Sequence, residues 1–157
     1  MKRGFTLIEI IIVITILGIL TGSGALVFRN ANEERKLKKD AELIEEVLGE
    51  AKNNALYRKI PPGYTCTTLI SYGVYFNGPG NTYSFWMNCP PNTPTLKAYP
   101  LKYTTYRTPS NVDCRFTYPN GISTGCTISL KNSAINKCIN ITVTTNGTVS
   151  LAPSYGC

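Results

Sequence analysis

The pattern of hydrophobic and polar residues changes twice along the chain, and its first part is apolar. Residues 5–28 are predominantly hydrophobic and contain one carboxylate, Glu9. At about 1.5 Å per residue, the run of about 23 residues from Phe5 to Val27 is long enough to cross the hydrocarbon core of a bilayer. We therefore predict a membrane-spanning helix over residues 5–28, preceded by a short leader at residues 1–4.

Residues 29–59 have the pattern of an amphipathic helix. Apolar side chains recur at alternating steps of four and three, which places them in one stripe, and the other faces carry mixed charge as a solvated surface should. Half of the stripe is alanine, which suits packing under a sheet better than a coiled coil. Prolines at 61 and 62 end the helix. The stripe consists of Leu37, Ala41, Ile44, Leu48, Ala51 and Ala55.

From residue 60 to residue 157 the pattern indicates short strands, so the predicted fold class is α+β, a long helix packed on an antiparallel β head. Asn146 and Gly147 give the strongest hairpin signal. The segment 89–100 contains four prolines and is predicted to be a loop. The predicted strands are Tyr72–Phe76, Tyr83–Met87, Leu101–Tyr106, Cys114–Tyr118, Cys126–Leu130, Cys138–Thr144 and Thr148–Leu151.

Six cysteines all lie after residue 65, in the part predicted to be outside the membrane. Their spacing contains no Cys-x-x-Cys pair, which argues against a zinc site and favours disulfides in an oxidising compartment. Six cysteines allow 15 pairings, and of these we expect Cys138–Cys157 to close the C-terminal loop. The candidates are Cys66, Cys89, Cys114, Cys126, Cys138 and Cys157.

The charge distribution suggests a basic head. The chain has 16 Lys and Arg against 9 Asp and Glu, and Asp113 is the one acid after residue 60. Basic residues interleaved with tyrosines can neutralise phosphates and stack bases. The alternative is that the tyrosines are ordinary strand residues and the charges keep the head soluble. The candidate DNA or anion face comprises Lys97, Lys102, Arg107 and Arg115.

The sequence offers little for catalysis. It has no histidine, which excludes Ser-His-Asp and Cys-His arrangements, and a single carboxylate beyond the helix excludes a paired-carboxylate site. No glycine-rich phosphate loop precedes a helix. We therefore expect no enzyme activity and no cofactor or metal.

The N-terminus suggests a processing site. Lys2 and Arg3 keep that end cytoplasmic, and the small residue Gly4 comes before the apolar segment rather than after it. A carboxylate such as Glu9 costs about 2.5–3.5 kcal/mol at the centre of a membrane helix and calls for a partner. Cleavage after Gly4 would create one, the α-amino group of Phe5, one turn away. The alternative is a glutamate that reaches the headgroups from a plain signal anchor.

Residues 1–9 resemble the class III leader and processing site of type IV pilins and type II secretion pseudopilins. The resemblance implies that a prepilin peptidase cleaves between Gly4 and Phe5 and N-methylates Phe5, and that Glu9 is the family's assembly glutamate. It also implies other pilins as partners. The precursor would sit in the inner (cytoplasmic) membrane with its head outside the cytoplasm, and then enter a cell-surface or periplasmic filament.

The chain departs from the family in one respect: many members carry a helix-kinking proline after the spanning segment, and this chain has none before Pro61. Gly18 and the glycines at 22 and 24 stand in that region, and each costs about 1 kcal/mol relative to alanine in a helix. We predict that the helix bends or locally melts there when subunits pack.

The head is similar in pattern to H-type pseudopilins and FimT-like minor pilins, which pack two antiparallel sheets or one curled sheet onto the helix. The resemblance implies a structural subunit, a minor pilin or pseudopilin. A filament-tip binding module (a DNA-uptake receptor or an adhesin) and a major pilin are alternatives. FimT-like DNA-uptake pilins carry arginines around the closing hairpin. Residues 146–149 of this chain contain none, which weighs against the DNA receptor.

Overall fold

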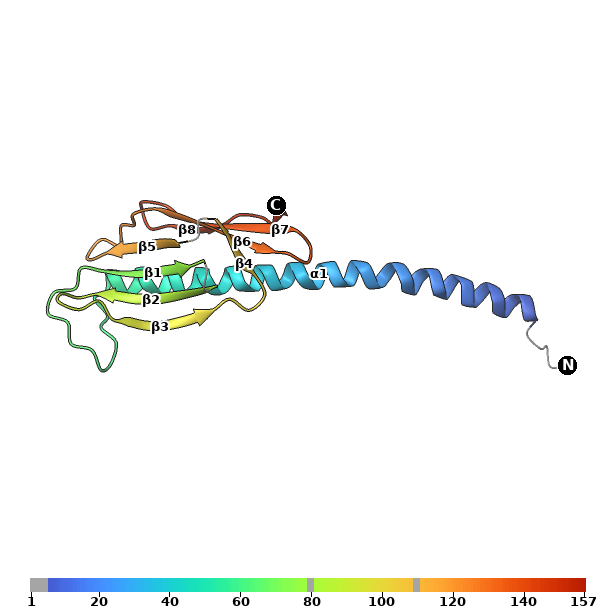
Figure 1. Ribbon diagram of the computed structural model, residues 1–157, viewed down its shortest axis with the longest axis horizontal. Helices are drawn as coiled ribbons and strands as arrows, with labels where there is room; N and C mark the ends of the chain where they lie inside the picture. Colours follow the sequence, from blue (N-terminus) through green and yellow to red (C-terminus); the bar gives the residue numbers. More distant parts are fainter. Residues whose placement is uncertain (1–5, 79–80, 109–110) are drawn as a thin grey trace.

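One helix dominates the computed structural model, which describes residues 6–78, 81–108 and 111–157, without the side chains of residues 20–26 and 107–108. Helix α1 spans Leu7–Leu56, and its first half extends beyond the head (Figure 1). The helix is continuous through Gly18 and residues 22–24. The predicted bend concerns an assembled filament and stays a prediction.

Two antiparallel sheets form the head, as the predicted α+β class requires. The first has the strand order β3-β2-β1-β5, and the second has the order β4-β6-β7-β8, with β9 paired to β7. The strands are β1 (Ser71–Asn77), β2 (Thr82–Asn88), β3 (Thr95–Pro100), β4 (Thr105–Thr108), β5 (Asn111–Thr117), β6 (Cys126–Asn132), β7 (Lys137–Val143), β8 (Val149–Leu151) and β9 (Tyr155–Gly156).

Both sheets pack along the second half of α1, which contacts β1, β5, β6, β7 and β8 (Figure 1). The predicted stripe of the helix faces this core, and all six of its side chains have no accessible surface. The predicted packing of the stripe under a sheet is therefore confirmed. The sheets contribute alternate side chains to the same core, among them Tyr72, Val74, Phe76, Phe116, Ile128 and Ile141.

The predicted closing hairpin is present between β7 and β8. Gly147 lies in its turn with a φ of 72°, a conformation that glycine adopts without strain. A Cβ at this position would lie 2.4 Å from the backbone oxygen of Gly121, so the turn also packs closely against a neighbouring loop. Glycine is required here by backbone angle and by space.

The prediction of a loop over residues 89–100 was wrong for its second half, which is strand β3. Pro94 precedes the strand and Pro100 is its last residue. Because β3 is the edge of its sheet, the missing N–H of Pro100 is tolerated. Tyr99 of β3 stacks on Tyr83 of β2 with ring centroids 4.9 Å apart, which supports the pairing of the two strands.

The prediction of a strand over Leu101–Tyr106 was also wrong in part, because β4 begins only at Thr105. The backbone N–H of Tyr103 and the hydroxyl of Thr104 both donate to the Asp40 carboxylate, at 3.0 and 2.8 Å. These two groups are therefore hydrogen-bonded to α1 rather than to a neighbouring strand.

Three disulfides join the six cysteines, including the expected Cys138–Cys157 pair. Cys114–Cys126 links β5 of the first sheet to β6 of the second. Cys66–Cys89 ties the loop after α1 to the end of β2. Their Cα–Cα distances of 5.4 to 5.7 Å are normal for a disulfide.

Candidate functional site

The part of α1 that extends beyond the head exposes apolar side chains on all of its faces. Between Leu7 and Ile19, ten large apolar side chains are 51% to 79% exposed. A helix that is apolar all round needs an apolar environment. Among the described residues, no helix has the length and hydropathy of a membrane span. The exposed side chains are Leu7, Ile8, Ile10, Ile11, Ile12, Val13, Ile14, Ile16, Leu17 and Ile19.

Glu9 takes part in the N-terminal cap of α1. Thr6 is the N-cap residue, and its backbone N–H and its hydroxyl donate to Oε2 of Glu9, each at 3.0 Å. The backbone N–H of Glu9 is 3.4 Å from the Thr6 hydroxyl oxygen, which completes a capping box. The Thr-x-x-Glu spacing could have revealed this in the sequence. Gly4 and Phe5 lie outside the described residues, so the predicted Glu9–Phe5 pair stays a prediction.

The contact between α1 and the head includes polar interactions that the sequence analysis missed. Asp40 is only 3% exposed, and it receives the two hydrogen bonds from the loop before β4. Its position three residues after Leu37 and four before Ile44 places it within the apolar stripe. A carboxylate within the apolar stripe could have indicated, from the sequence alone, a buried hydrogen-bond acceptor.

Two acids nearer the N-terminus bind the end of the head, and we call Glu33 and Glu34 the neck carboxylates. The Asn132 side chain donates to the backbone oxygen and Oε2 of Glu33, at 3.2 and 3.1 Å. Lys137 lies 2.8 Å from Glu34, which also accepts from Ser154. Hydrogen bonds from Lys36 and Asn132 lower the pKa of Glu33, and hydrogen bonds from Lys137 and Ser154 lower that of Glu34.

The lowered pKa values of the neck carboxylates predict that the docking of the head depends on pH. Because their folded-state pKa values are lowered, their contribution is present at neutral pH and is lost as the pH falls through those values. We expect the Tm of the head to fall as the pH is lowered below about 4.3, the ordinary value for glutamate. Glu34→Gln should flatten this dependence modestly, because the pair is partly exposed.

The matched control is Glu42→Gln, which removes an exposed carboxylate. Its ion pair, at 3.6 Å, is with Lys38 of the same helix and not with the head. This variant should show the same fall in Tm at low pH as the parent chain. Identical profiles for Glu34→Gln and the parent chain would contradict the role given to the neck.

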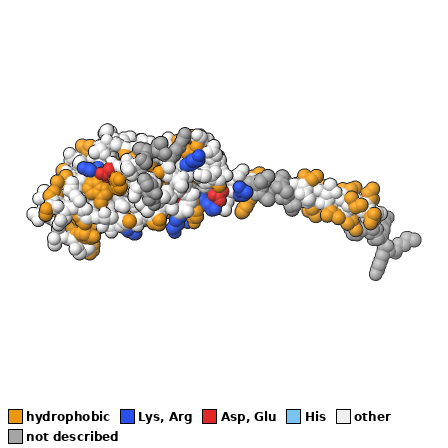
Figure 2. Space-filling view, in the orientation of Figure 1, with side chains coloured by type: hydrophobic (Ala, Val, Ile, Leu, Met, Phe, Trp, Pro, Cys, Tyr) orange, Lys and Arg blue, Asp and Glu red, His pale blue; other side chains and the backbone are white. Residues whose placement is uncertain are grey.

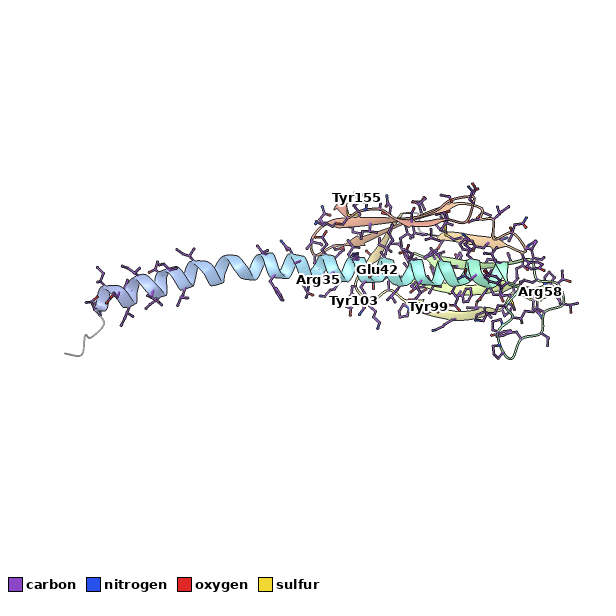
Figure 3. All side chains as sticks on the ribbon, turned by 180° about the vertical axis from the view of Figure 1, so that it is seen from behind. Arg35, Glu42, Arg58, Tyr99, Tyr103 and Tyr155 are labelled. Carbon is purple, nitrogen blue, oxygen red and sulfur yellow. A yellow bond between two sulfur atoms is a disulfide. The ribbon has the colours of Figure 1, made fainter. Side chains whose placement is uncertain are left out.

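The structure brings two of the four predicted basic residues together. Lys97 and Lys102 line a cavity of about 390 Å³ between α1 and the edge strand β3. Three helix carboxylates line the same cavity, those of Asp40, Glu46 and Glu50. Figure 3 shows Tyr99 and Tyr103, from β3 and from the loop after it, on one side of α1 in that view. The two lysines therefore face more negative charge than positive.

The other two basic residues lie elsewhere. Arg115 is on β5 and donates to Asp113 at 2.7 Å, beside a different cavity. Arg107 lies in β4 of the second sheet, and its side chain is outside the described residues. The structure thus does not assemble Lys97, Lys102 and Arg115 into one basic surface.

Comparison with known proteins gives two matches. Residues 1–25 match the family model of the prokaryotic N-terminal methylation motif. The fold is similar to that of the minor pseudopilin EpsH from the type 2 secretion system of Vibrio cholerae, with a TM-score of 0.57 and 14% identity over 74% of this chain and 96% of that chain. No curated protein sequence matches the chain. The chain therefore combines the methylation motif with a pilin-like α+β fold.

Proposed function

We propose that this chain is a minor structural subunit, a minor pilin or pseudopilin, of a type IV pilus-like or type II secretion-like filament. The observation that carries the proposal is the exposed apolar part of α1 beyond the head. Such a surface is stable only in a membrane or against other apolar helices. A precursor anchored in the inner membrane and a subunit packed in a filament core are the two environments that meet this need.

Processing at the leader would prepare the chain for assembly. The methylation motif supports cleavage by a prepilin peptidase between Gly4 and Phe5 and methylation of the new amine. That amine would carry a positive charge close to Glu9. In a filament core with little water, a subunit that aligns the two charges is favoured over one that leaves Glu9 unpaired.

The head supports a minor subunit. The protein with the similar fold is described as a minor pseudopilin, and by analogy this chain would occupy few positions in its filament. The DNA-receptor alternative draws less support, because Lys97 and Lys102 share their cavity with three carboxylates and Arg115 is paired with Asp113. Phosphate binding requires net positive charge at the surface.

Quantitative mass spectrometry of sheared filaments tests this proposal. We expect a peptide that begins with N-methylated Phe5, present in trace amounts relative to the most abundant pilin. A dominant signal from this peptide would identify a major pilin and overturn the minor role. A peptide that still begins at Met1 would overturn the processing step.

A further inference from the structure

The single tryptophan of the chain lies on the outer face of the first sheet. Trp86 of β2 pairs with Gly73 of β1, and the indole covers the glycine: a Cβ added at Gly73 would be 2.5 Å from Cζ2 of the ring. Because Gly73 has no side chain, the ring can rest on the backbone of β1 while remaining partly exposed. A half-buried indole held against a sheet offers an aromatic surface to a ligand.

Two charged residues of β5 fix the position of the ring. Nε1 of Trp86 donates to Oδ1 of Asp113 at 3.1 Å, and Arg115 donates to Oδ2 of the same carboxylate at 2.7 Å. The Arg115 guanidinium carbon is 5.1 Å from the indole centroid, within the range of a cation–π contact. The indole is therefore ordered before any ligand arrives, which reduces the entropy lost on binding.

The tryptophan lies in a shallow cavity of about 410 Å³. This volume is within the range of about 300–1,000 Å³ typical of small-molecule sites. Figure 2 shows hydrophobic atoms next to one acidic and basic pair on the head surface. Trp86, Asp113 and Arg115 line this cavity. The other lining side chains carry hydroxyl or amide groups that both donate and accept hydrogen bonds: Tyr75, Ser84, Asn88, Thr93 and Thr95.

We propose that this cavity, the Trp86 platform, binds a neutral saccharide. The ring face of a pyranose carries C–H bonds with partial positive charge, and these can rest on the part of the indole that Gly73 and Arg115 leave exposed. Its hydroxyls match the hydroxyl and amide groups at the rim. The platform lies on the head and shares no residue with the apolar part of α1 that carries the filament proposal, so the two proposals stand or fall separately.

The charge of the platform selects a neutral ligand over a nucleic acid. Asp113 is the one acid after residue 60, and it lies beside the indole and neutralises Arg115. A stacked nucleotide would place its phosphate near a surface without net positive charge, and close to a carboxylate. A sugar meets no such penalty, and Asp113 can also accept a hydrogen bond from one of its hydroxyls.

The test uses the full chain in micelles of a detergent without a sugar headgroup. Because Trp86 is the only tryptophan, its fluorescence reports on this site alone. The probes are four neutral disaccharides (maltose, lactose, cellobiose and N,N′-diacetylchitobiose) and a short oligothymidylate. We expect a saturable fluorescence change with at least one disaccharide in the millimolar range. No response to any of the four, or a response to the oligothymidylate alone, would overturn the proposal.

Two variants of the platform and one control variant test whether Trp86 binds the saccharide. Gly73→Ala retains the indole but places a methyl group where the ring lies, and should weaken saccharide binding at least about fivefold, the equivalent of about 1 kcal/mol for one stacking contact. Trp86→Ala should abolish binding, and NMR saturation transfer from the protein to the saccharide measures this without the tryptophan fluorescence. The control is Tyr57→Ala, which removes an aromatic side chain that lies outside the platform and is 79% exposed. It should leave the saturation-transfer signal unchanged. Equal signals from Trp86→Ala and the parent chain would overturn the assignment.

Discussion

Replacement of Glu9 by alanine should leave leader cleavage intact and remove the chain from filaments. We propose that a prepilin peptidase cleaves the bond between Gly4 and Phe5, whereas we assign Glu9 to the pairing of the new α-amino group inside an apolar core. Loss of one partner from a buried ion pair costs about 3–5 kcal/mol. The amount of the variant in sheared filaments should therefore fall at least about a hundredfold.

Immunoblots of membranes and of sheared filaments measure the two steps separately. The matched control is Glu46→Ala, which removes an exposed carboxylate from the head half of the same helix. It should be processed and incorporated like the parent chain. Incorporation of Glu9→Ala at the parent level would refute the assembly role, and an uncleaved Glu9→Ala precursor would show that the residue acts earlier.

Leu48→Ala should produce the second large effect, a loss of head stability. The Leu48 side chain has no accessible surface and lies between α1 and the sheets. Truncation of a buried leucine to alanine costs about 2–5 kcal/mol, because contacts are lost and a cavity remains. Denaturant unfolding of the full chain in micelles, followed by the fluorescence of Trp86, measures the change.

Leu43 provides the matched control on the same helix. It is 40% exposed, so Leu43→Ala should change the free energy of unfolding by no more than about 1 kcal/mol. Similar losses for the two variants would contradict the assignment of the stripe as the surface that holds the head.

The sequence predicted the parts of the fold that depend on simple periodicity. The stripe from Leu37 to Ala55 follows from spacing alone, and the β7–β8 hairpin follows from the backbone preferences of Asn146 and Gly147. Strand β3 was missed because proline counts against strands in general, whereas an edge strand tolerates it at its end.

The predicted basic face was less reliable, because the sequence shows which residues are charged but not which opposite charges lie beside them. Lys97 and Lys102 were grouped with Arg115 as one basic surface, but the fold places helix carboxylates beside the lysines and Asp113 beside the arginine. The role of Gly73 under Trp86 depends on strand register, which a single sequence does not provide.

The positions of the disulfides have a mechanical consequence. In the filament proposed above, tension would pull on each subunit along α1, and the head could extend only by unfolding segments of its chain. The segments 66–89, 114–126 and 138–157 are closed by covalent bonds and cannot lengthen under that pull. Extension is thus confined to the segments between these loops, and the bond between β5 and β6 keeps the two sheets together even after their hydrogen bonds break.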